Sequence, residues 1–263
     1  MHKTRLALTL MMAISLTACS ASPTGRNQLL LFSDNDMSHL GAQSFSQMKQ
    51  EIPISKDSKT NSYVQCVANA ITAQVPKQPG FEQWEVVVFE SDQVNAFALP
   101  GGKIGVYTGL LKVAINQDQL ATVLGHEVAH VLSNHSNERL SQSQLANAGL
   151  QLTDIAIGAS EYNQYRSLTM AALGVGVQYG VILPYGRSQE SEADVLGLAL
   201  MAKAGFEPNQ SIELWKNMAK ASGGNQPPEL LSTHPSHSTR INDLSATIAS
   251  LPPYQGNRAH CAM

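Results

Sequence analysis

Five consecutive residues, His126-Glu127-Val128-Ala129-His130, carry the side chains of this sequence that are best suited to metal chemistry. An α-helix turns once every ~3.6 residues, so two imidazoles four positions apart leave the same face and can bind one ion. Glu127 follows the first histidine, where its carboxylate can take a proton from an attacking water molecule. The pattern predicts a hydrolytic zinc site, although H-E-x-x-H also occurs by chance in helices.

The residues around this run predict a buried helix. Asn116 is a suitable N-cap, and Gln119 stands at the reciprocal position of a capping box. Burying two imidazoles without partners is costly, and a metal ion removes that cost. An apolar stripe for packing this helix into a core is formed by Leu120, Val123, Leu124, Val128, Val131 and Leu132.

A catalytic zinc site usually has three protein ligands and a position for water, so one more ligand is needed. His135 is one residue short of the third histidine in H-E-x-x-H-x-x-G-x-x-H, and Ser133 replaces its glycine, so we interpret His135 as a helix-end or surface residue. Glu190 is a better candidate. Asp194 lies four residues later on the same helical face and can fix the tautomer of a ligand imidazole. We interpret Glu192 as solvated or structural.

The sequence resembles peptidase family M48, the HtpX-like zinc metalloendopeptidases. The similarity covers most of the chain after its N-terminal segment, in the family's order. It is carried by N-A-F-A-L-P-G-G at 95–102, H-E-V-A-H at 126–130, E-S-E-A-D at 190–194, and H-P followed by arginine at 234–240.

This resemblance implies an α+β fold, a mainly helical gluzincin-type metallopeptidase domain with a small, mostly antiparallel sheet next to the H-E-x-x-H helix. It implies one zinc ion per chain, although ligation by two histidines and a glutamate does not exclude cobalt or manganese. The implied site consists of the ligands His126, His130 and Glu190, the general base Glu127, the supporting acid Asp194, and His234 and Arg240 lining the site.

The expected roles of Arg240 and His234 are less well defined than those of the metal ligands. A cationic Arg240 near zinc could stabilise the oxyanion that forms as water attacks the scissile carbonyl. His234 could do the same, or could occupy the fourth metal position and hold the enzyme inactive. The alternative is that His234-Pro235 merely starts a helix.

Three runs rich in β-branched and aromatic residues, 84–89, 94–99 and 103–110, predict the sheet. Pro100-Gly101-Gly102 marks the turn between the last two. In zinc proteases with this helix, an edge strand next to the metal binds substrate in extended form. We expect the strand with Asn95, Ala96, Phe97 and Ala98 to be that edge, with an ordinary hairpin as the alternative.

The N-terminus has the pattern of a targeting segment, with a basic start followed by an apolar stretch over residues 6–16 that is too short to span a bilayer stably. Leu16-Thr17-Ala18-Cys19 resembles a bacterial lipobox. It predicts a signal peptide over 1–18 and a lipid anchor on Cys19, with an ordinary secretory cleavage site as the alternative. Ser20 after the cysteine favours, by resemblance to lipoprotein sorting, the periplasmic side of the outer membrane of a Gram-negative bacterium.

The remaining cysteines, Cys66 and Cys261, would then lie in a compartment that permits disulfides. We predict that they pair and tie the C-terminal tail to a helix around residues 59–74. Two free thiols are the alternative.

Length and charge indicate one ordinary domain. The chain has 263 residues, 17 basic and 20 acidic side chains and a net charge of -3, which gives no support for nucleic-acid binding. We expect a short tether over 19–33 and the peptidase domain over 34–263. The uncharged run 167–186 has about the ~20 residues of a membrane span, but its glycines and proline argue against one. We interpret 138–186 as a helical insert covering the cleft.

These features predict a zinc endopeptidase, and the resemblance implies that its substrates are misfolded envelope proteins. A competing hypothesis is an assembly factor or chaperone for outer-membrane proteins, working with the outer-membrane assembly machinery, in which proteolysis is latent. A metal-storage module is a third, but it would leave Glu127 and Arg240 without a purpose.

Overall fold

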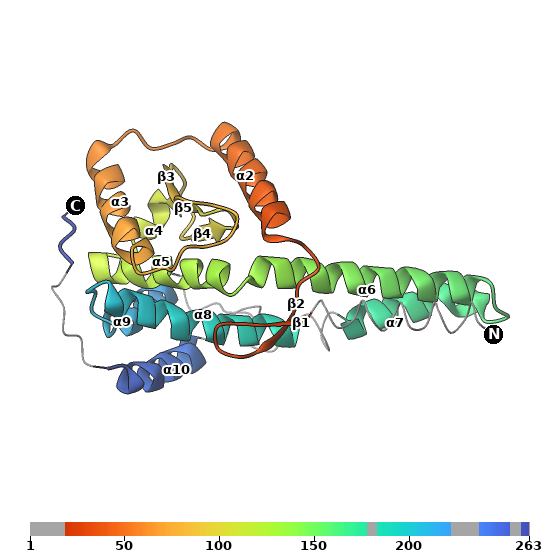
Figure 1. The fold of residues 1–263 in the computed structure, drawn as a ribbon. Coiled ribbons are helices and arrows are strands. Elements are labelled where there is room, and N and C mark those ends of the chain that lie inside the picture. The colour runs from red at the N-terminus through yellow and green to blue at the C-terminus, as the bar shows by residue number, and fades with distance from the viewer. Residues whose placement is uncertain (1–18, 178–182, 222–236, 253–258, 263) are drawn as a thin grey trace.

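The protein is described here by a computed structural model covering residues 19–177, 183–221, 237–252 and 259–262 (Figure 1). Its mainly helical α+β architecture confirms the predicted fold class. The strands are β1 (Cys19–Ala21), β2 (Asn27–Leu29), β3 (Glu85–Phe89), β4 (Ala96–Leu99) and β5 (Lys103–Tyr107). The helices are α2 (Asp34–Glu51), α3 (Ser58–Thr72), α4 (Thr108–Leu111), α5 (Gln117–Leu132), α6 (His135–Gly158), α7 (Arg166–Val177), α8 (Leu183–Lys203), α9 (Gln210–Ala221) and α10 (His237–Ser250), with a 3-10 turn, η1 (Asn163–Tyr165), before α7.

The central sheet has three strands in the order β3-β5-β4. The turn at Gly101 and Gly102, both with positive φ, makes β4 antiparallel to β5. The third strand, β3, pairs with the other side of β5 and runs parallel to it. The three-stranded sheet is therefore mixed, and its parallel pair was not predicted because strand propensity does not determine which strands become neighbours.

The two faces of this sheet pack against different helices, as side chains alternate along each strand. Phe97 and Tyr107 lie on the face covered by α2, where they join Phe45. Ala96 and Ala98 point to the opposite face, in the cluster that includes residues of α3 and α5. Their small side chains allow α5 to lie close to β4.

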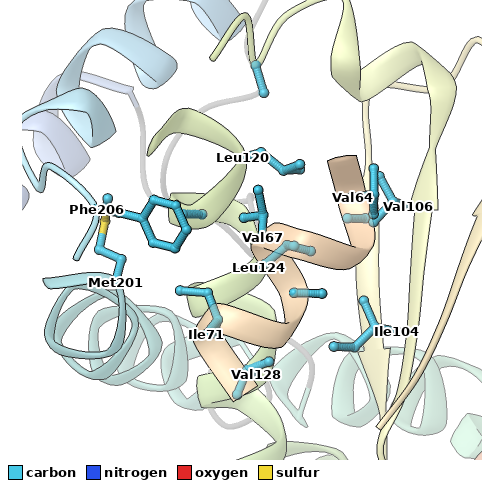
Figure 2. Close-up of a cluster of buried hydrophobic side chains, with 14 of the residues drawn as sticks. Val64, Val67, Ile71, Ile104, Val106, Leu120, Leu124, Val128, Met201 and Phe206 are labelled. Carbon is cyan, nitrogen blue, oxygen red and sulfur yellow. The ribbon is translucent and has the colours of Figure 1, made fainter. Parts of the chain in front are cut away.

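The helix α5 lies in the largest apolar cluster of the described chain (Figure 2). The Asn116 side chain caps it by accepting a hydrogen bond from the Gln119 N–H at 2.9 Å, as predicted. Figure 2 shows Leu120, Leu124 and Val128 of α5 together with Val64, Val67, Ile71, Ile104, Val106, Met201 and Phe206.

Two glycines allow α5 and α8 to pack closely. A Cβ added at Gly125 would lie 2.8 Å from the carbonyl oxygen of Gly197. A Cβ added at Gly197 would lie 2.7 Å from the backbone nitrogen of His126. The two helices therefore approach backbone to backbone beside the first histidine of the motif, a separation that larger side chains would prevent.

The first described residues form a β1–β2 hairpin that docks on the body, which corrects the expected tether over 19–33. Arg26 binds Glu138 through both terminal nitrogens, at 2.6 and 2.7 Å, and its Nε contacts Glu192 at 3.1 Å. Both carboxylates are buried. Because buried charges need partners, the polar residues of this segment form a structural contact and are not merely solvated.

The helices α6 and α7 pack against each other, and Figure 1 shows that the pair projects away from the central sheet. Helices α6 and α7 lie within the segment 138–186 that was expected to be a helical insert, and its role as a cover of the cleft stays a prediction. Large apolar side chains are exposed on the pair, among them Leu145, Leu152, Ile155 and Leu168. None of the helices in the described segments is both long enough and apolar enough to cross a membrane.

The C-terminal tail returns to the start of α5. The structure places Cys66 of α3 and Cys261 in a disulfide. Gln117, the first residue of α5, accepts from the Cys261 N–H at 2.7 Å and donates to the Ala259 carbonyl at 2.8 Å. The disulfide and these hydrogen bonds hold the tail against both helices.

Candidate active site

Helices α5 and α8 bring three candidate metal ligands together. His126 and His130 leave one face of α5, and Glu190 faces them from α8. The Nε2 atoms of the two imidazoles are 3.0 Å apart. Glu190 Oε2 lies 3.2 Å from His126 Nε2, and Glu190 Oε1 lies 3.4 Å from His130 Nε2.

These separations fit one tetrahedral ion. Metal–ligand bonds of about 2.0–2.1 Å at tetrahedral angles separate the ligand atoms by about 3.3 Å. The three observed distances lie between 3.0 and 3.4 Å. The three ligands are therefore arranged to bind a divalent ion. Each of the two histidine side chains is 12% exposed, so the ligand cluster is accessible from solvent.

Asp194 contacts the first imidazole. Its Oδ1 lies 2.9 Å from His126 Nδ1, which leaves Nε2 directed toward the ligand cluster. Burial and Arg240 lower the pKa of His126, but hydrogen bonds to Asp194 and Glu190 raise it to about 9 in the metal-free chain. Metal binding must therefore displace a proton from this imidazole at neutral pH.

The second imidazole is supported by a residue that sequence patterns missed. His135 is 1% exposed, so its interpretation as a surface residue is wrong, although it does begin α6. Its Nδ1 is 2.8 Å from His130 Nδ1, and its Nε2 is 3.1 Å from Glu192 Oε2. Burial lowers the pKa of His130 to about 3, which favours the neutral form that binds metals. The available signal was Ser133-Asn134, a pair that favours a helix end and thus a turn in the chain.

Glu127 lies beside the ligand cluster and next to the edge of the sheet. Burial raises the pKa of Glu127, and the nearby backbone N–H of Ala98 acts against this rise. A raised pKa brings a carboxylate closer to the range in which it can both accept and return a proton. The geometry is therefore suitable for the general base predicted from the motif.

Two arginines balance the negative charge around Glu190. Arg240 is 2% exposed, donates from Nη2 to Asp194 Oδ1 at 2.6 Å, and lies with Nη1 3.5 Å from Glu190 Oε2. Its guanidinium stacks over Trp215, with Cζ 3.9 Å from the ring centroid. Arg139 Nη2 lies 3.2 Å from Glu190 Oε1, a contact that the sequence did not indicate. These contacts make Arg240 a buried partner of the two acids, and its role at a substrate oxyanion stays a prediction.

The predicted edge strand does lie at an edge of the three-stranded sheet. The Asn95 carbonyl accepts from the Tyr107 N–H at 3.2 Å, and antiparallel alternation then directs the backbone groups of Ala96 and Ala98 away from β5. The Ala96 N–H donates to Asn95 Oδ1 at 2.9 Å, and the backbone N–H of Ala98 lies near Glu127. Phe97 points into the α2 cluster, so its side chain is structural.

A cavity of about 120 Å³ adjoins His130 at the far end of this strand. Apolar and polar side chains from α2, the loop before β3, the β4–β5 turn, and the junction of α5 and α6 surround it. They include Met37, Phe81, Pro100, Val131, Asn134 and Asn137. Its position is suitable for a side chain of a ligand bound along the edge.

Two predicted roles, those of His234 and Cys19, are not tested by these observations. His234 lies outside the described residues. Cys19 is the first residue of β1, and the predicted signal peptide 1–18 precedes the described chain.

Comparison with known proteins bears on this site. Residues 57–248 match the family described as Peptidase family M48. The mitochondrial metalloendopeptidase OMA1 of Danio rerio is 32% identical over 255 residues, covering 90% of this chain and 51% of that protein. OMA1 of Schizosaccharomyces pombe is 35% identical over 163 residues, or 62% of this chain and 46% of that protein. The beta-barrel assembly-enhancing protease of Yersinia pestis is 27% identical over 219 residues, or 79% and 43%. The chain thus spans about half the length of these relatives.

Proposed function

The chain belongs to peptidase family M48, and from this premise we propose that it is a zinc-dependent endopeptidase that hydrolyses proteins of the bacterial cell envelope. The observation that carries the proposal is the cluster of His126, His130 and Glu190 with Glu127 beside it. Two imidazole nitrogens and one carboxylate oxygen are the three protein ligands that a catalytic zinc site would need.

The side chains of the chain divide the work of hydrolysis. Zinc held by His126, His130 and Glu190 would supply a Lewis acid that could polarise a peptide carbonyl and lower the pKa of water. Glu127 accepts the proton of the attacking water and delivers it to the leaving amine. Asp194 holds His126 with Nε2 toward the ligand cluster, and Arg240 keeps Asp194 charged, because it lowers the pKa of Asp194 against the effect of burial.

The edge of β4 is the proposed binding site for the substrate backbone. An extended peptide added to this edge would pass close to Glu127, because α5 packs against β4 and the backbone of Ala98 is near enough to lower the pKa of that carboxylate. The cavity next to His130 then receives one substrate side chain. Ala96→Pro, which alters the free edge, should reduce peptide cleavage while zinc content is retained. Unchanged cleavage would contradict the edge-strand role.

The proposed location is the periplasmic face of the outer membrane, with a lipid on Cys19. The lipobox supports it, as does the similarity to a bacterial beta-barrel assembly-enhancing protease. Other relatives are mitochondrial, so the location depends mainly on the lipobox. Because β1 begins at Cys19, a lipid there would hold the folded body close to the bilayer. Misfolded envelope proteins are the proposed substrates, and a Cys19→Ala variant that stays in the membrane fraction would contradict the anchor.

Glu127→Gln tests the catalytic proposal. The amide keeps the size of the side chain but cannot accept the proton, so casein cleavage should fall by about 10²–10⁴-fold. Zinc content, measured by elemental analysis, should stay at one ion per chain, because Glu127 is not a ligand. Glu213→Gln, a surface change on α9, serves as the control with normal cleavage. Cleavage by Glu127→Gln at the wild-type rate would exclude this mechanism.

A second candidate function, binding of unfolded outer-membrane proteins, is favoured by the exposed apolar side chains of α6 and α7. Leu152 is 69% exposed and Ile155 is 66% exposed. Such side chains on a projecting helix pair suit a surface that holds unfolded polypeptide. Under this reading, Glu127→Gln retains substrate binding, and Leu152→Ser with Ile155→Ser loses it without loss of short-peptide cleavage. Equal binding by wild type and the double serine variant would exclude it.

A further inference from the structure

A chain of hydrogen bonds runs from the candidate ligand His130 to the N-terminal hairpin. His135 joins His130 through its Nδ1, at 2.8 Å, and Glu192 through its Nε2, at 3.1 Å. Glu192 also accepts from Thr24 Oγ1 at 2.7 Å and from Arg26 Nε at 3.1 Å. His135 and Glu192 are 1% and 5% exposed, so solvent does not supply alternative partners.

The chemistry of these partners determines where the protons lie. A carboxylate only accepts, so His135 carries a hydrogen on Nε2. If His135 also carried a hydrogen on Nδ1, His130 Nδ1 would have to accept a hydrogen bond from it. Neutral His130 would then carry its own hydrogen on Nε2, and that hydrogen would point at the ligand cluster. Metal binding requires a lone pair at that Nε2. The arrangement compatible with an ion therefore has His130 donating from Nδ1 to His135.

The backbone between α5 and α6 is shaped for this contact. In an uninterrupted helix, a residue five positions on would lie about 140° around the axis from His130. Here Asn134 adopts φ 52, a left-handed conformation that is uncommon outside glycine, and α6 begins immediately after it. This turn returns the imidazole of His135 to His130. Gln28 of the hairpin donates to the Ser133 carbonyl at the same junction.

We propose that His135 is a positioning residue for metal binding, which holds His130 in the Nδ1–H tautomer while Glu192 and the β1–β2 hairpin hold His135. The arrangement parallels that of Asp194 at His126, with an imidazole inserted between the ligand and the carboxylate. The inference rests on the proposed metal-dependent function. Through Arg26, the β1–β2 hairpin would thus help to position the metal ligands, although it lies far before them in the sequence.

Two substitutions separate positioning from packing. His135→Phe fills a similar volume but offers no acceptor, so zinc affinity in a chelator competition should fall by about 10–100-fold. His135→Asn places an acceptor oxygen near the position of Nδ1 but loses the Glu192 contact, so it should bind zinc more tightly than His135→Phe and more weakly than wild type. The free energy of unfolding of the metal-free variants should not rank in the same order as their zinc affinity, because asparagine leaves a cavity and loses the Glu192 contact. Affinities that fall together with stability would overturn the proposal.

The tautomers can also be observed without any substitution. In a long-range ¹⁵N–¹H spectrum of the zinc-loaded protein, we expect His130 to be protonated on Nδ1 and His135 on Nε2. A His135 protonated on Nδ1 alone would overturn the inference. If the wild type binds no zinc, the proposed function fails. If it binds zinc but His135→Phe binds equally well, only the positioning role fails.

The contribution of the hairpin is tested at Arg26. Arg26→Lys keeps the charge but not the fork that contacts Glu138 and Glu192 at once, so zinc affinity should fall by about tenfold. Arg166→Lys is the matched control, because Arg166 pairs with Asp154 on the surface of the projecting helices. Equal zinc affinities for the two variants would exclude the hairpin from the support of the site.

Discussion

Replacing Gly197 by alanine tests whether the close packing of α5 on α8 sets the geometry of the metal site. The added methyl would lie 2.7 Å from the backbone nitrogen of His126 and 2.9 Å from its Cα. Ordinary contact begins at 3.4 Å, so the helices must separate by 3.4 − 2.7, or about 0.7 Å. That shift exceeds the roughly 0.2 Å tolerance of metal–ligand distances. Zinc affinity should therefore fall at least tenfold.

Stability gives a second measure of the same substitution. Overpacking costs about 1–3 kcal/mol, whereas alanine in place of glycine inside a helix contributes about 0.8–1 kcal/mol of stability. Gly149→Ala isolates the second effect, because nothing lies within 4 Å of a Cβ there. The free energy of unfolding of Gly197→Ala should thus lie about 1–3 kcal/mol below that of Gly149→Ala. If urea unfolding and chelator titration show two equally stable variants with wild-type zinc affinity, the reasoning is refuted.

Three further results are expected. Burial lowers the pKa of His126, but neighbouring carboxylates raise it to about 9. Zinc binding at pH 7 should therefore release about one proton. In the metal-free protein, protonation of His126 should stabilise the fold fully below pH 6.5, and this stabilisation should be lost as pH rises through about 9. Calorimetry in buffers of different ionisation enthalpy counts that proton, and a count of zero would be inconsistent. Reducing Cys66–Cys261 should lower the free energy of unfolding by about 2–5 kcal/mol, and an unchanged melting temperature under reductant would argue otherwise. Burial raises the pKa of Glu192, but hydrogen bonds lower it to about 2. Its ionised carboxylate should therefore contribute fully to stability above pH 4.5, and this contribution should disappear as pH falls toward 2. In acid unfolding, the stability of Glu192→Gln should depend less on pH than that of wild type.

The parts of the site that lie on single helices were predictable from the sequence. His126 and His130 are four residues apart, as are Glu190 and Asp194, and this spacing puts each pair on one helical face whatever the rest of the fold does. The N-cap at Asn116 is equally local. What the sequence could not give is the approach of the two helices, which depends on glycines in different elements.

The features that were missed depend on distant contacts. His135 has its role because of a left-handed turn and a carboxylate on another helix, and neither follows from its spacing to the motif. Arg26 lies in the segment 19–33 that was expected to be a tether, yet it contacts Glu138 and Glu192 across more than 100 residues. The parallel pairing of β3 with β5 likewise depends on chain topology, which strand propensity does not encode.

The central claim is that His126, His130 and Glu190 bind one ion between α5 and α8. The most direct test is the zinc content of the purified protein after dialysis, compared between wild type, Glu190→Gln and the surface control Glu213→Gln. We predict one zinc ion per chain in wild type and control, and at least a tenfold loss of affinity in Glu190→Gln, because a neutral amide is a weaker ligand. Stoichiometric zinc in Glu190→Gln, bound as tightly as in wild type, would contradict the claim.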